Sequence, residues 1–447
     1  MTYIKEGQIL QPFLVEAVRE HNALPLTGRC NLSCIFCSHR HNPPDIKAFS
    51  FAPLSEGLWS DLAQYLDPGR KIIIGESATR LREGEPFTHP QIYRILERLR
   101  LLYPETAIQI TTNAALINEN ALKILATLKP LEMVISLNSA TAAGRNLLMN
   151  DFRPENALRV LSMMNNYNIP FHGSLVALPH LVGFDDLRKT IVFLDQAGAL
   201  TVRLLLPGYT AFSDLAVVPP PGTSEILYSF VSEIKSELKG VLLAEPPLIE
   251  NLDSVVEGVN VNSPAFSAGI MAGDIVTEIN GIETLSRVGT FNTLYSSYNP
   301  VLTVKRGSDF IKVSSSKKGS ESFGLIMNYD LDPDQIKRVK ESLNLSASAL
   351  MLLSKPALKR WEVAADKFDI KNLTFQAVDS LYFGGSINCA GLLTVRDFQQ
   401  AYNNANNPLS FDNILVPAVA FDSNGQDLSG SSYLNLKTGS IPVTLVT

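Results

Sequence analysis

Short apolar runs alternate with amphipathic stretches from about residue 22 to residue 210, and this alternation limits the folds open to the chain. The runs expected as strands are 22–27, 71–76, 107–112, 133–137, 171–177 and 202–206, with helices expected at 54–67, 90–102, 119–128, 154–166 and 185–196. This order predicts a parallel sheet with right-handed crossovers. Six units make an α/β fold with a partial parallel (β/α)6 barrel, whose ligands meet the carboxyl ends of the strands.

Three of the four cysteines lie together directly after the first expected strand. They are Cys30, Cys34 and Cys37, spaced C-x3-C-x2-C. Three thiolates at this spacing can converge on one inorganic centre, and they leave one coordination position without a nearby cysteine. Structural zinc, completed by His39 or His41, is the alternative that the spacing leaves open.

The segment Cys30–Cys37, with Phe36 before its last cysteine, resembles the cluster-binding loop of radical S-adenosylmethionine (radical SAM) enzymes. The resemblance implies that the thiolates hold three irons of a [4Fe–4S] cluster and that SAM chelates the fourth. It also implies reductive cleavage of SAM to a 5′-deoxyadenosyl radical, which abstracts hydrogen from a substrate. Flavodoxin or ferredoxin is the kind of electron donor that such an enzyme implies. The family's core is a partial βα barrel, in agreement with the alternation.

In that family a glycine–glutamate motif after the second strand meets the amino group of SAM. Two segments of this chain are candidates. Gly75-Glu76 directly follows the apolar residues of its strand and is preferred, because ligands meet strand ends. The second segment, Glu83-Gly84-Glu85-Pro86-Phe87, is closer to the family's motif, but the polar residues Arg80 and Arg82 precede it.

The resemblance implies further SAM contacts at later strand ends. Ser136 and Asn138 end the fourth strand, where relatives contact the ribose and carboxylate of SAM, and Arg145 follows within reach of a carboxylate. Asn113 closes the third strand and is a candidate for the same pocket, and Ser174 on the fifth strand is a candidate for the adenine. Structural explanations stay open, since Asn138 can cap a helix and a single arginine is usually solvated.

Three other residues have suitable chemistry, but a structural role is preferred for each. His172 and His180 flank the fifth strand and are expected to be satisfied structural histidines rather than substrate contacts. Cys389 stands alone in an apolar run and is expected to be a small core residue rather than a redox thiol or an additional ligand.

The second half of the chain changes character after Pro246-Pro247. The stretches 262–265, 268–276 and 279–281 resemble a bacterial PDZ domain, expected at 250–328 after a barrel domain at 1–245. Residues 332–447 are expected to form an α+β domain. Its stretches 382–394, 414–418 and 441–446 resemble the terminal domain of PDZ-carrying iron–sulfur oxidoreductases, which are grouped with nitrogenase-cofactor and molybdopterin assembly enzymes. In that family the PDZ domain precedes the cysteine loop, so the domain order here is rearranged.

Composition excludes several classes of function. The net charge of −6 and the lack of a local Lys/Arg run argue against general nucleic-acid binding. The N-terminus lacks the apolar core of a signal peptide, and the longest apolar runs are too short to span a bilayer. A cytoplasmic protein is therefore expected, because three clustered cysteines and a distant one are not a secreted disulfide framework.

The sequence thus favours a radical SAM enzyme that acts on an unidentified small molecule, cofactor precursor or peptide, with a possible protein partner at the PDZ-like domain. One alternative is a SAM-dependent methyl or sulfur transferase with the same cluster. The other is a zinc-stabilised PDZ adaptor without catalysis.

Overall fold

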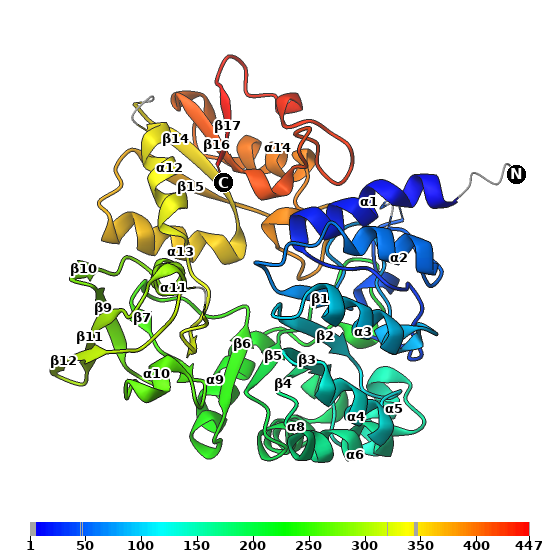
Figure 1. Cartoon of the computed structure of the whole chain (residues 1–447). Helices are drawn as coiled ribbons and strands as arrows, with labels where there is room; N and C mark the ends of the chain where they lie inside the picture. Colours follow the sequence, from blue (N-terminus) through cyan, green and yellow to red (C-terminus); the bar gives the residue numbers. More distant parts are fainter. Residues whose placement is uncertain (1–5, 45, 47, 320, 344–346, 447) are drawn as a thin grey trace, which may run out of the picture. The chain divides into compact units, whose positions relative to one another are not determined.

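The structure, a computed structural model, describes residues 6–44, 46, 48–319, 321–343 and 347–446, and these form two compact units (Figure 1). The first unit extends to Glu245. The segments 43–45 and 208–212 belong to the second unit, which continues from Pro246. Each unit is built around its own sheets and helices.

The first unit contains a six-stranded sheet in the sequential order β1-β2-β3-β4-β5-β6, and every neighbouring pair is parallel. Its strands are β1 (Ile72–Ile74), β2 (Ile108–Thr112), β3 (Leu131–Ser136), β4 (Phe171–Val176), β5 (Thr201–Leu205) and β6 (Val241–Glu245). Sequential parallel order is what successive right-handed βα units produce. The α/β parallel sheet predicted from the alternation is confirmed.

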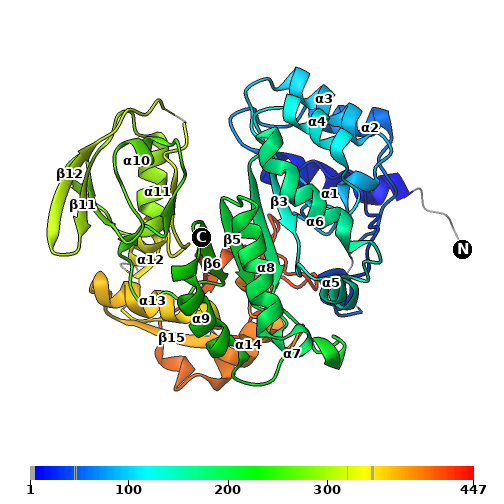
Figure 2. The ribbon, with the colours of Figure 1, turned by 90° about the horizontal axis from the view of Figure 1, so that it is seen from below.

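Most helices of the first unit pack against the strands in one core, whereas α5 belongs to a separate small cluster; α6 and α8 can be followed over the sheet in Figure 2. The helices are α1 (Glu6–His21), α2 (Glu56–Ala63), α3 (Ile92–Leu102), α4 (Glu119–Thr127), α5 (Ala142–Met149), α6 (Pro154–Met164), α7 (Pro179–Val182), α8 (Phe184–Gln196) and α9 (Thr223–Ile234). None of the described helices is long and apolar enough to cross a membrane.

The strands of this sheet alternate between a buried apolar face and a partly exposed polar face. In β2, for example, Ile108 and Ile110 are buried, whereas Gln109 and Thr111 are partly exposed. The strand register places further polar residues on the same face as Gln109, namely Glu132, His172, Ser174 and Arg203. The helices therefore cover the apolar face, and the polar face is left for ligands.

Two strand predictions need correction. Residues 22–27 form no regular strand, although Ala23 pairs with Ile73 through a single parallel bridge. Pro25 interrupts this segment, and a proline has no N–H to donate to a ladder. The sixth strand is instead β6, which the sequence reading missed because its short apolar run lies between a helix and Pro246-Pro247.

The second unit begins with small antiparallel sheets. Its strands there are β7 (Ser254–Val255), β8 (Gly258–Val259), β9 (Ile275–Ile279), β10 (Ile282–Glu283), β11 (Val301–Arg306), β12 (Asp309–Ser314) and β13 (Leu325–Ile326), with helices α10 (Pro264–Ser267) and α11 (Arg287–Ser296). β10, β9, β11 and β12 lie in one sheet, with β7 beside β9, and β13 pairs with β8. A separate apolar cluster fills this β-rich part.

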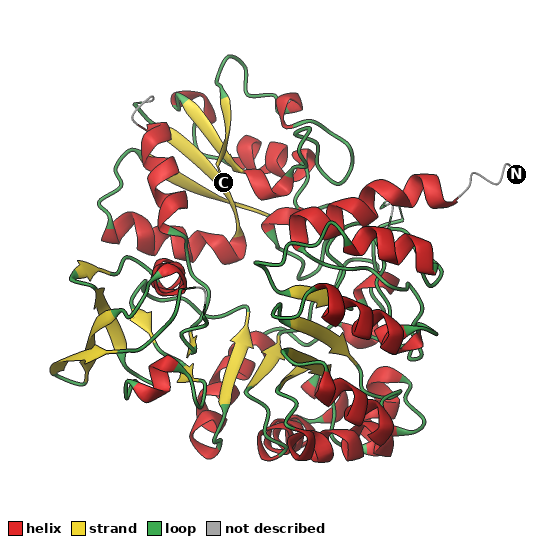
Figure 3. Ribbon diagram, viewed as in Figure 1, coloured by secondary structure: helices red, strands yellow, loops and turns green. Residues whose placement is uncertain are grey.

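The second unit also contains a four-stranded parallel sheet in the order β15-β14-β16-β17 (Figure 3). Its elements are β14 (Ala349–Ser354), β15 (Leu373–Val378), β16 (Asn413–Pro417) and β17 (Val443–Val446), with α12 (Pro333–Leu343), α13 (Lys355–Lys367) and α14 (Val395–Asn404). The α+β prediction for 332–447 differs from this α/β order. The difference arises because β14 and β15 were not predicted from the sequence.

Gly75, at the end of β1, tests how tightly the strand ends are packed. Its φ is +84°, and an added Cβ would lie 2.4 Å from the carbonyl oxygen of Thr111. Gly75→Ala should therefore lower the free energy of unfolding by about 2 kcal/mol or more, through strain and overpacking together. Gly222→Ala is the matched control, because its φ is +83° and nothing lies within 4 Å of its added Cβ. Equal losses in urea unfolding would contradict the close packing at Gly75.

Candidate active site at the carboxyl ends of the parallel strands

The cysteine loop is held by the C-terminal end of α5. Ser33 donates its N–H to the carbonyl of Met149 at 3.1 Å, and Ile35 donates to the carbonyl of Leu148 at 2.9 Å. The last carbonyls of a helix have no partner within the helix, so the loop satisfies groups that need one. Side chains of the loop also join a small apolar cluster, which includes Leu32, Cys34, Ile35, Phe36, Leu148, Met149, Val176 and Leu178. This cluster brings the loop to the end of β4.

The three thiols influence one another. Burial raises the pKa of Cys34 to about 12, with further increases from Cys30 and Cys37, while the nearby Arg145 acts in the opposite direction. Burial also raises the pKa of Cys30, and the negative charges of Glu85 and Cys37 add to that shift. Because thiolates are the metal-binding form, metal binding here would displace protons from these thiols.

The cysteine loop offers three thiols, and three thiolates are the ligands that a [4Fe–4S] cluster with one open iron requires. Within the described ranges, no three Cys, His, Asp or Glu side chains, these cysteines included, are already gathered around a position for a metal ion. Nε2 of His39 lies 3.2 Å from the carbonyl of Glu83, and Nε2 of His41 lies 2.7 Å from that of Ile35. A hydrogen bond at one ring nitrogen leaves the other able to bind zinc, so these contacts do not exclude the zinc alternative.

The second glycine–glutamate segment lies directly beside the start of the cysteine loop. Gly84 donates its N–H to the carbonyl of Thr27, and Glu85 donates to the carbonyl of Arg29, both at 2.8 Å. A Cβ added to Gly84 would stand 2.0 Å from the oxygen of Arg29. Only glycine therefore allows this segment to approach the residue before Cys30 so closely.

The Glu85 carboxylate connects this segment to the end of β2. It accepts hydrogen bonds from the N–H of Asn113 at 2.8 Å and from the hydroxyl of Thr112 at 2.7 Å, and the residue is 4% exposed. Burial raises the pKa of Glu85, although these donors favour the ionised form and oppose the shift. Asn113 in turn donates its side-chain N–H to the amide oxygen of Asn31 in the cysteine loop, at 2.9 Å.

The preferred glycine–glutamate pair, Gly75-Glu76, has a different environment. The Glu76 side chain is exposed and accepts hydrogen bonds from Gln109 at 3.0 Å and Thr111 at 2.7 Å on the polar face of the sheet. Gly75 packs against Pro86, with only 2.6 Å from its added Cβ to Cγ of the proline. The two candidate segments therefore lie next to each other, but the segment that hydrogen-bonds to the residues before Cys30 is Glu83–Pro86.

The Arg145 side chain is fully buried, and its guanidinium donates hydrogen bonds to several groups of the protein. Its Nε donates to Asp151 at 2.8 Å, Nη1 donates to the carbonyl of Leu137 at 2.8 Å, and Nη2 lies 2.7 Å from Asp151 and 3.3 Å from the carbonyl of Asn113. The guanidinium thus joins the ends of β2 and β3 to α5. Its donors are engaged within the protein, which makes Arg145 a positioning residue in this structure.

Of the remaining predicted contacts, the asparagines are engaged and the serines are not. The side chain of Asn138, 2% exposed, accepts the N–H of Val176 at 2.9 Å and so joins the ends of β3 and β4. Ser136 and Ser174 are directly paired across those strands and are partly exposed. Neither hydroxyl has a hydrogen-bond partner in the part of the chain that the structure describes, so both can meet a ligand.

His172, His180 and Cys389 have environments of their own. Nδ1 of His172 lies 2.7 Å from the hydroxyl of Thr201, and burial lowers the pKa of this histidine. Nε2 of His180 lies 3.0 Å from the carbonyl of Ala216, whereas its Nδ1 is buried and has no hydrogen-bond partner among the described residues. Cys389 is exposed, so the expectation that it is a core residue is wrong.

Sequence reasoning missed the residues that support the loop. Asn31 was not considered, although its position inside the cysteine motif was a signal. Asp151 lies six residues after Arg145. This spacing does not place two residues on the same face of a helix, so no sequence pattern predicted the ion pair. Glu83 was named only as part of a candidate segment; it is 8% exposed and accepts the N–H of Leu26, while its second oxygen has no hydrogen-bond partner among the described residues.

A comparison with protein families bears directly on this site. The sequence model of the radical SAM superfamily matches residues 24–194, which include the cysteine loop, β1 to β4 and Arg145. Residues 24–194 are a radical SAM domain. Members of this superfamily are enzymes that use a [4Fe–4S] cluster and SAM. The cofactor of this superfamily is therefore one that the three thiols of the cysteine loop can bind. No curated protein sequence matches the chain.

Solved structures with similar regions are distant. Streptococcus suis SuiB bound to precursor peptide SuiA is 17% identical, with a TM-score of 0.40 and 55% of each chain covered. Native anSMEcpe with bound AdoMet is 13% identical, with a TM-score of 0.36, covering 48% of this chain and 60% of that one. Methylornithine synthase (PylB) is 9% identical, with a TM-score of 0.36, covering 54% and 72%. The chain thus spans little more than half the length of SuiB.

The environment of Arg145 generates a stability prediction. Arg145→Met should lower the free energy of unfolding by about 3–5 kcal/mol, because it leaves the Asp151 carboxylate buried without its cation. Arg188→Met is the control, since Arg188 forms its ion pairs with Glu233 and Glu237 at the surface, and its loss should cost much less than that of Arg145. Urea unfolding of both variants measures the difference. Similar small losses of unfolding free energy in both variants would show that the Arg145–Asp151 ion pair does not have this structural role.

Glu83 generates a prediction about pH. Burial raises the pKa of its carboxyl well above the ordinary range, so the folded protein holds this proton more tightly than the unfolded chain. Its contribution to stability is complete below the ordinary glutamate pKa and is lost as the pH rises through the raised value. Glu83→Gln should therefore flatten the decrease in melting temperature between pH 5 and pH 8. Glu56→Gln, at an exposed site, should not, and a parallel pH profile for Glu83→Gln and wild type would refute the assignment.

Proposed function

We propose that the chain is a radical SAM enzyme that uses a [4Fe–4S] cluster on Cys30, Cys34 and Cys37 to initiate hydrogen abstraction from a substrate. When bound, the cluster supplies the electron that cleaves SAM to methionine and a 5′-deoxyadenosyl radical. The observation that carries the proposal is the position of the three-cysteine loop inside a radical SAM domain, at the carboxyl ends of parallel strands. There the chain's own task is to position the cofactor and exclude water.

Within this proposal, the residues around the loop have separate tasks. The carbonyls of Leu148 and Met149 hold the loop, and the buried Arg145 fixes the helix that presents them. The Glu83–Pro86 segment meets the amino group of SAM, because its backbone hydrogen-bonds to the residues before Cys30. The unpaired hydroxyls of Ser136 and Ser174 contact SAM further along the strand ends, and Phe36 also contributes to the cofactor site from the apolar cluster around the cysteine loop.

The substrate of the proposed reaction is polar. Gln109, Glu132, His172 and Arg203 share the sheet face that the helices leave uncovered. A face with both acidic and basic side chains favours a substrate with hydrogen-bonding or charged groups over a hydrocarbon. A small molecule, a cofactor precursor and a peptide all meet this description.

We further assign residues 250–328 to a PDZ-like domain and 332–447 to the terminal domain of a rearranged PDZ-carrying oxidoreductase. The antiparallel strands β9, β11 and β12 with helices α10 and α11 support the first assignment. In this proposal the PDZ-like domain binds a protein partner by strand addition. The reducing cytoplasm, with flavodoxin or ferredoxin as electron donor, suits the cluster.

The proposed chemistry is tested with anaerobically reconstituted protein, SAM and dithionite. The wild type should bind about four irons and produce 5′-deoxyadenosine, as expected for one [4Fe–4S] cluster. Cys34→Ala should lose the cluster and the product, whereas Cys389→Ser, which changes the exposed cysteine outside the radical SAM domain, should keep both. Retained cleavage in Cys34→Ala would refute the proposal. Formation of S-adenosylhomocysteine would instead favour a methyl transferase.

A second experiment distinguishes the two glycine–glutamate segments. Equilibrium dialysis of SAM against the reconstituted protein should show about tenfold weaker binding for Glu85→Gln, because glutamine cannot accept all the donors that orient this segment. Glu76→Gln should bind SAM within about twofold of the wild type. The reverse result would assign the SAM contact to Gly75-Glu76. Iron content serves as the control that both variants keep the cluster.

A further inference from the structure

Charge is unevenly compensated on the polar face of the first sheet. Three described carboxylates, those of Glu76, Glu132 and Glu245, lie on this face. Glu132 pairs with Lys71, and Glu245 pairs with Arg203. Glu76 forms no ion pair with any residue that the structure describes; its partners there are neutral donors. The polar face therefore keeps an uncompensated negative charge at the end of β1.

The Glu76 carboxylate is held in place, and one of its oxygens is left free. Gln109 and Thr111 both donate to Oε1, at 3.0 and 2.7 Å. Oε2 has no hydrogen-bond partner in the described part of the chain, and the residue is exposed. The backbone before it is fixed by Gly75, which packs closely against Thr111 and Pro86. Two neutral donors orient the carboxylate without neutralising it, so Oε2 can accept a hydrogen bond from a ligand.

An electrostatic effect on Arg203 indicates where Glu76 lies. The hydrogen bonds to Glu245 raise the pKa of Arg203, burial opposes that shift, and the negative charges of Glu245 and Glu76 raise the pKa further. Arg203 is on β5, four strands from β1. In a flat sheet these strands would be about 19 Å apart, a distance at which exposed charges are largely screened. The sheet is therefore curled, and Glu76 faces the same concave side as Arg203.

The other ionisable group on this side does not offset the charge of Glu76. Nδ1 of His172 lies 2.7 Å from the hydroxyl of Thr201, and burial lowers the pKa of this histidine from its ordinary value. The imidazole is therefore neutral at pH 7. A cationic ligand group on the concave side of the sheet would meet an oriented carboxylate that no protein cation already occupies.

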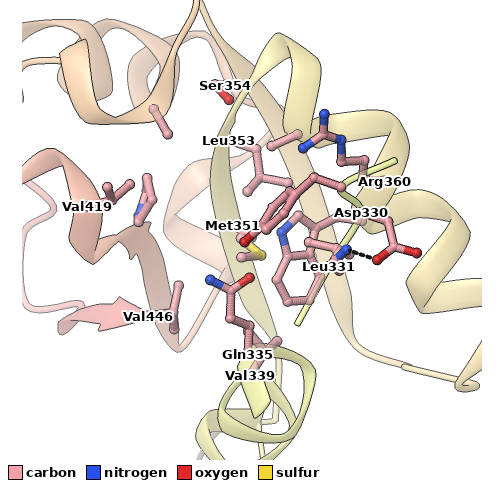
Figure 4. Close-up of a pocket in the computed structure, with 15 residues that line it drawn as sticks. Asp330, Leu331, Gln335, Val339, Met351, Leu353, Ser354, Arg360, Val419 and Val446 are labelled. Atoms are coloured by element: carbon pink, nitrogen blue, oxygen red, sulfur yellow. Dashed lines mark hydrogen bonds between the residues drawn. The ribbon is translucent and has the colours of Figure 1, made fainter. Parts of the chain in front are cut away.

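A carboxylate of the second unit shows the contrasting state. Asp330 lines a pocket of about 180 Å³, drawn in Figure 4. It accepts the N–H groups of Arg287 and Val288, at 2.9 and 3.1 Å, and pairs with the Arg287 guanidinium at 3.2 Å. It also accepts the N–H of Leu331, drawn as a dashed line in Figure 4. The charge of Asp330 is thus neutralised within the protein, whereas that of Glu76 is not.

We propose that Glu76 binds an ammonium group of the substrate and so selects amines. The inference rests on the proposed radical SAM function, in which the substrate lies on this face of the sheet. The ammonium donates to the free Oε2 in a charge-assisted hydrogen bond, while Gln109 and Thr111 keep the carboxylate oriented. Glu76 is then a residue that determines substrate specificity, and the contact with SAM belongs to the Glu83–Pro86 segment.

Isothermal titration calorimetry at pH 7 on the reconstituted full chain with SAM tests the proposal. Butylamine represents a free amine, and Nα-acetyl-lysinamide represents a lysine side chain of a peptide. The tighter of the two should bind with a Kd between about 100 µM and 5 mM. Butanol and Nα-acetyl-norleucinamide, the neutral counterparts, should bind at least about tenfold more weakly. Equal binding of amine and neutral counterpart, tighter binding of butyrate than of butylamine, or no binding of either amine up to about 20 mM would overturn the proposal.

Matched variants locate the amine. Glu76→Gln keeps the size of the side chain and an acceptor for Gln109 and Thr111 but removes the charge, so it should weaken binding of the tighter amine about tenfold. Glu97→Gln makes the same change at an exposed position of α3, outside the polar face, and should leave amine binding unchanged. Circular dichroism checks that both variants are folded. Unchanged amine binding in Glu76→Gln would refute the assignment of this residue.

Two readouts separate this inference from the proposed function. Formation of 5′-deoxyadenosine by the wild type tests the reaction, whereas amine binding that depends on Glu76 tests the ammonium site. Cleavage of SAM without amine binding would refute the ammonium site alone. Amine binding that is lost in Glu76→Gln, in a protein that does not cleave SAM, would support the ammonium site and refute the proposed reaction.

Discussion

The buried guanidinium of Arg145 is the interaction on which the candidate active site depends. It binds carbonyls at the ends of β2 and β3 and the carboxylate of Asp151 just beyond α5, so three elements meet at one charge. The carbonyls at the end of α5 then hold the cysteine loop. A buried cation without its carboxylate would be strongly destabilising, and the pair therefore favours the arrangement that keeps these segments together. The position of the cysteines follows from packing that is remote from the thiols themselves.

A second constraint comes from the opposite side of the loop. The Glu83–Pro86 segment runs against the residues before Cys30, and Gly84 allows that approach because a Cβ would collide with the Arg29 carbonyl. Glu85 then reaches the end of β2, where Asn113 continues the hydrogen bonds back to Asn31. The loop is thus held from α5 on one side and from β2 on the other. Such support is what keeps three flexible cysteine side chains within reach of one inorganic centre.

The sequence was informative where a physical pattern is local. The βα alternation predicted the parallel sheet, because that pattern is local, and C-x3-C-x2-C predicts a metal site on a loop that the structure places at the end of α5. It failed where a contact joins distant segments. Arg145 was predicted to meet a ligand carboxylate, but in the structure it pairs with Asp151, a partner that no helical spacing indicates. The strand predicted at 22–27 was wrong for a local reason. Its apolar pattern is typical of a strand, but Pro25 has no N–H to donate to a neighbouring strand.

The two parallel sheets illustrate one rule with different outcomes. In each, polar groups gather at the carboxyl ends of the strands, where backbone and helix termini offer unsatisfied hydrogen-bonding groups. In the first sheet, Arg145, Asn138 and Glu85 each bond to neighbouring groups of the protein, and the hydroxyls of Ser136 and Ser174 are left for a ligand. In the second, Ser354 and Pro417 end β14 and β16, and the carboxylate of Asp330 pairs with Arg287. A polar group without a partner at a strand end indicates a ligand position more directly than the residue type alone.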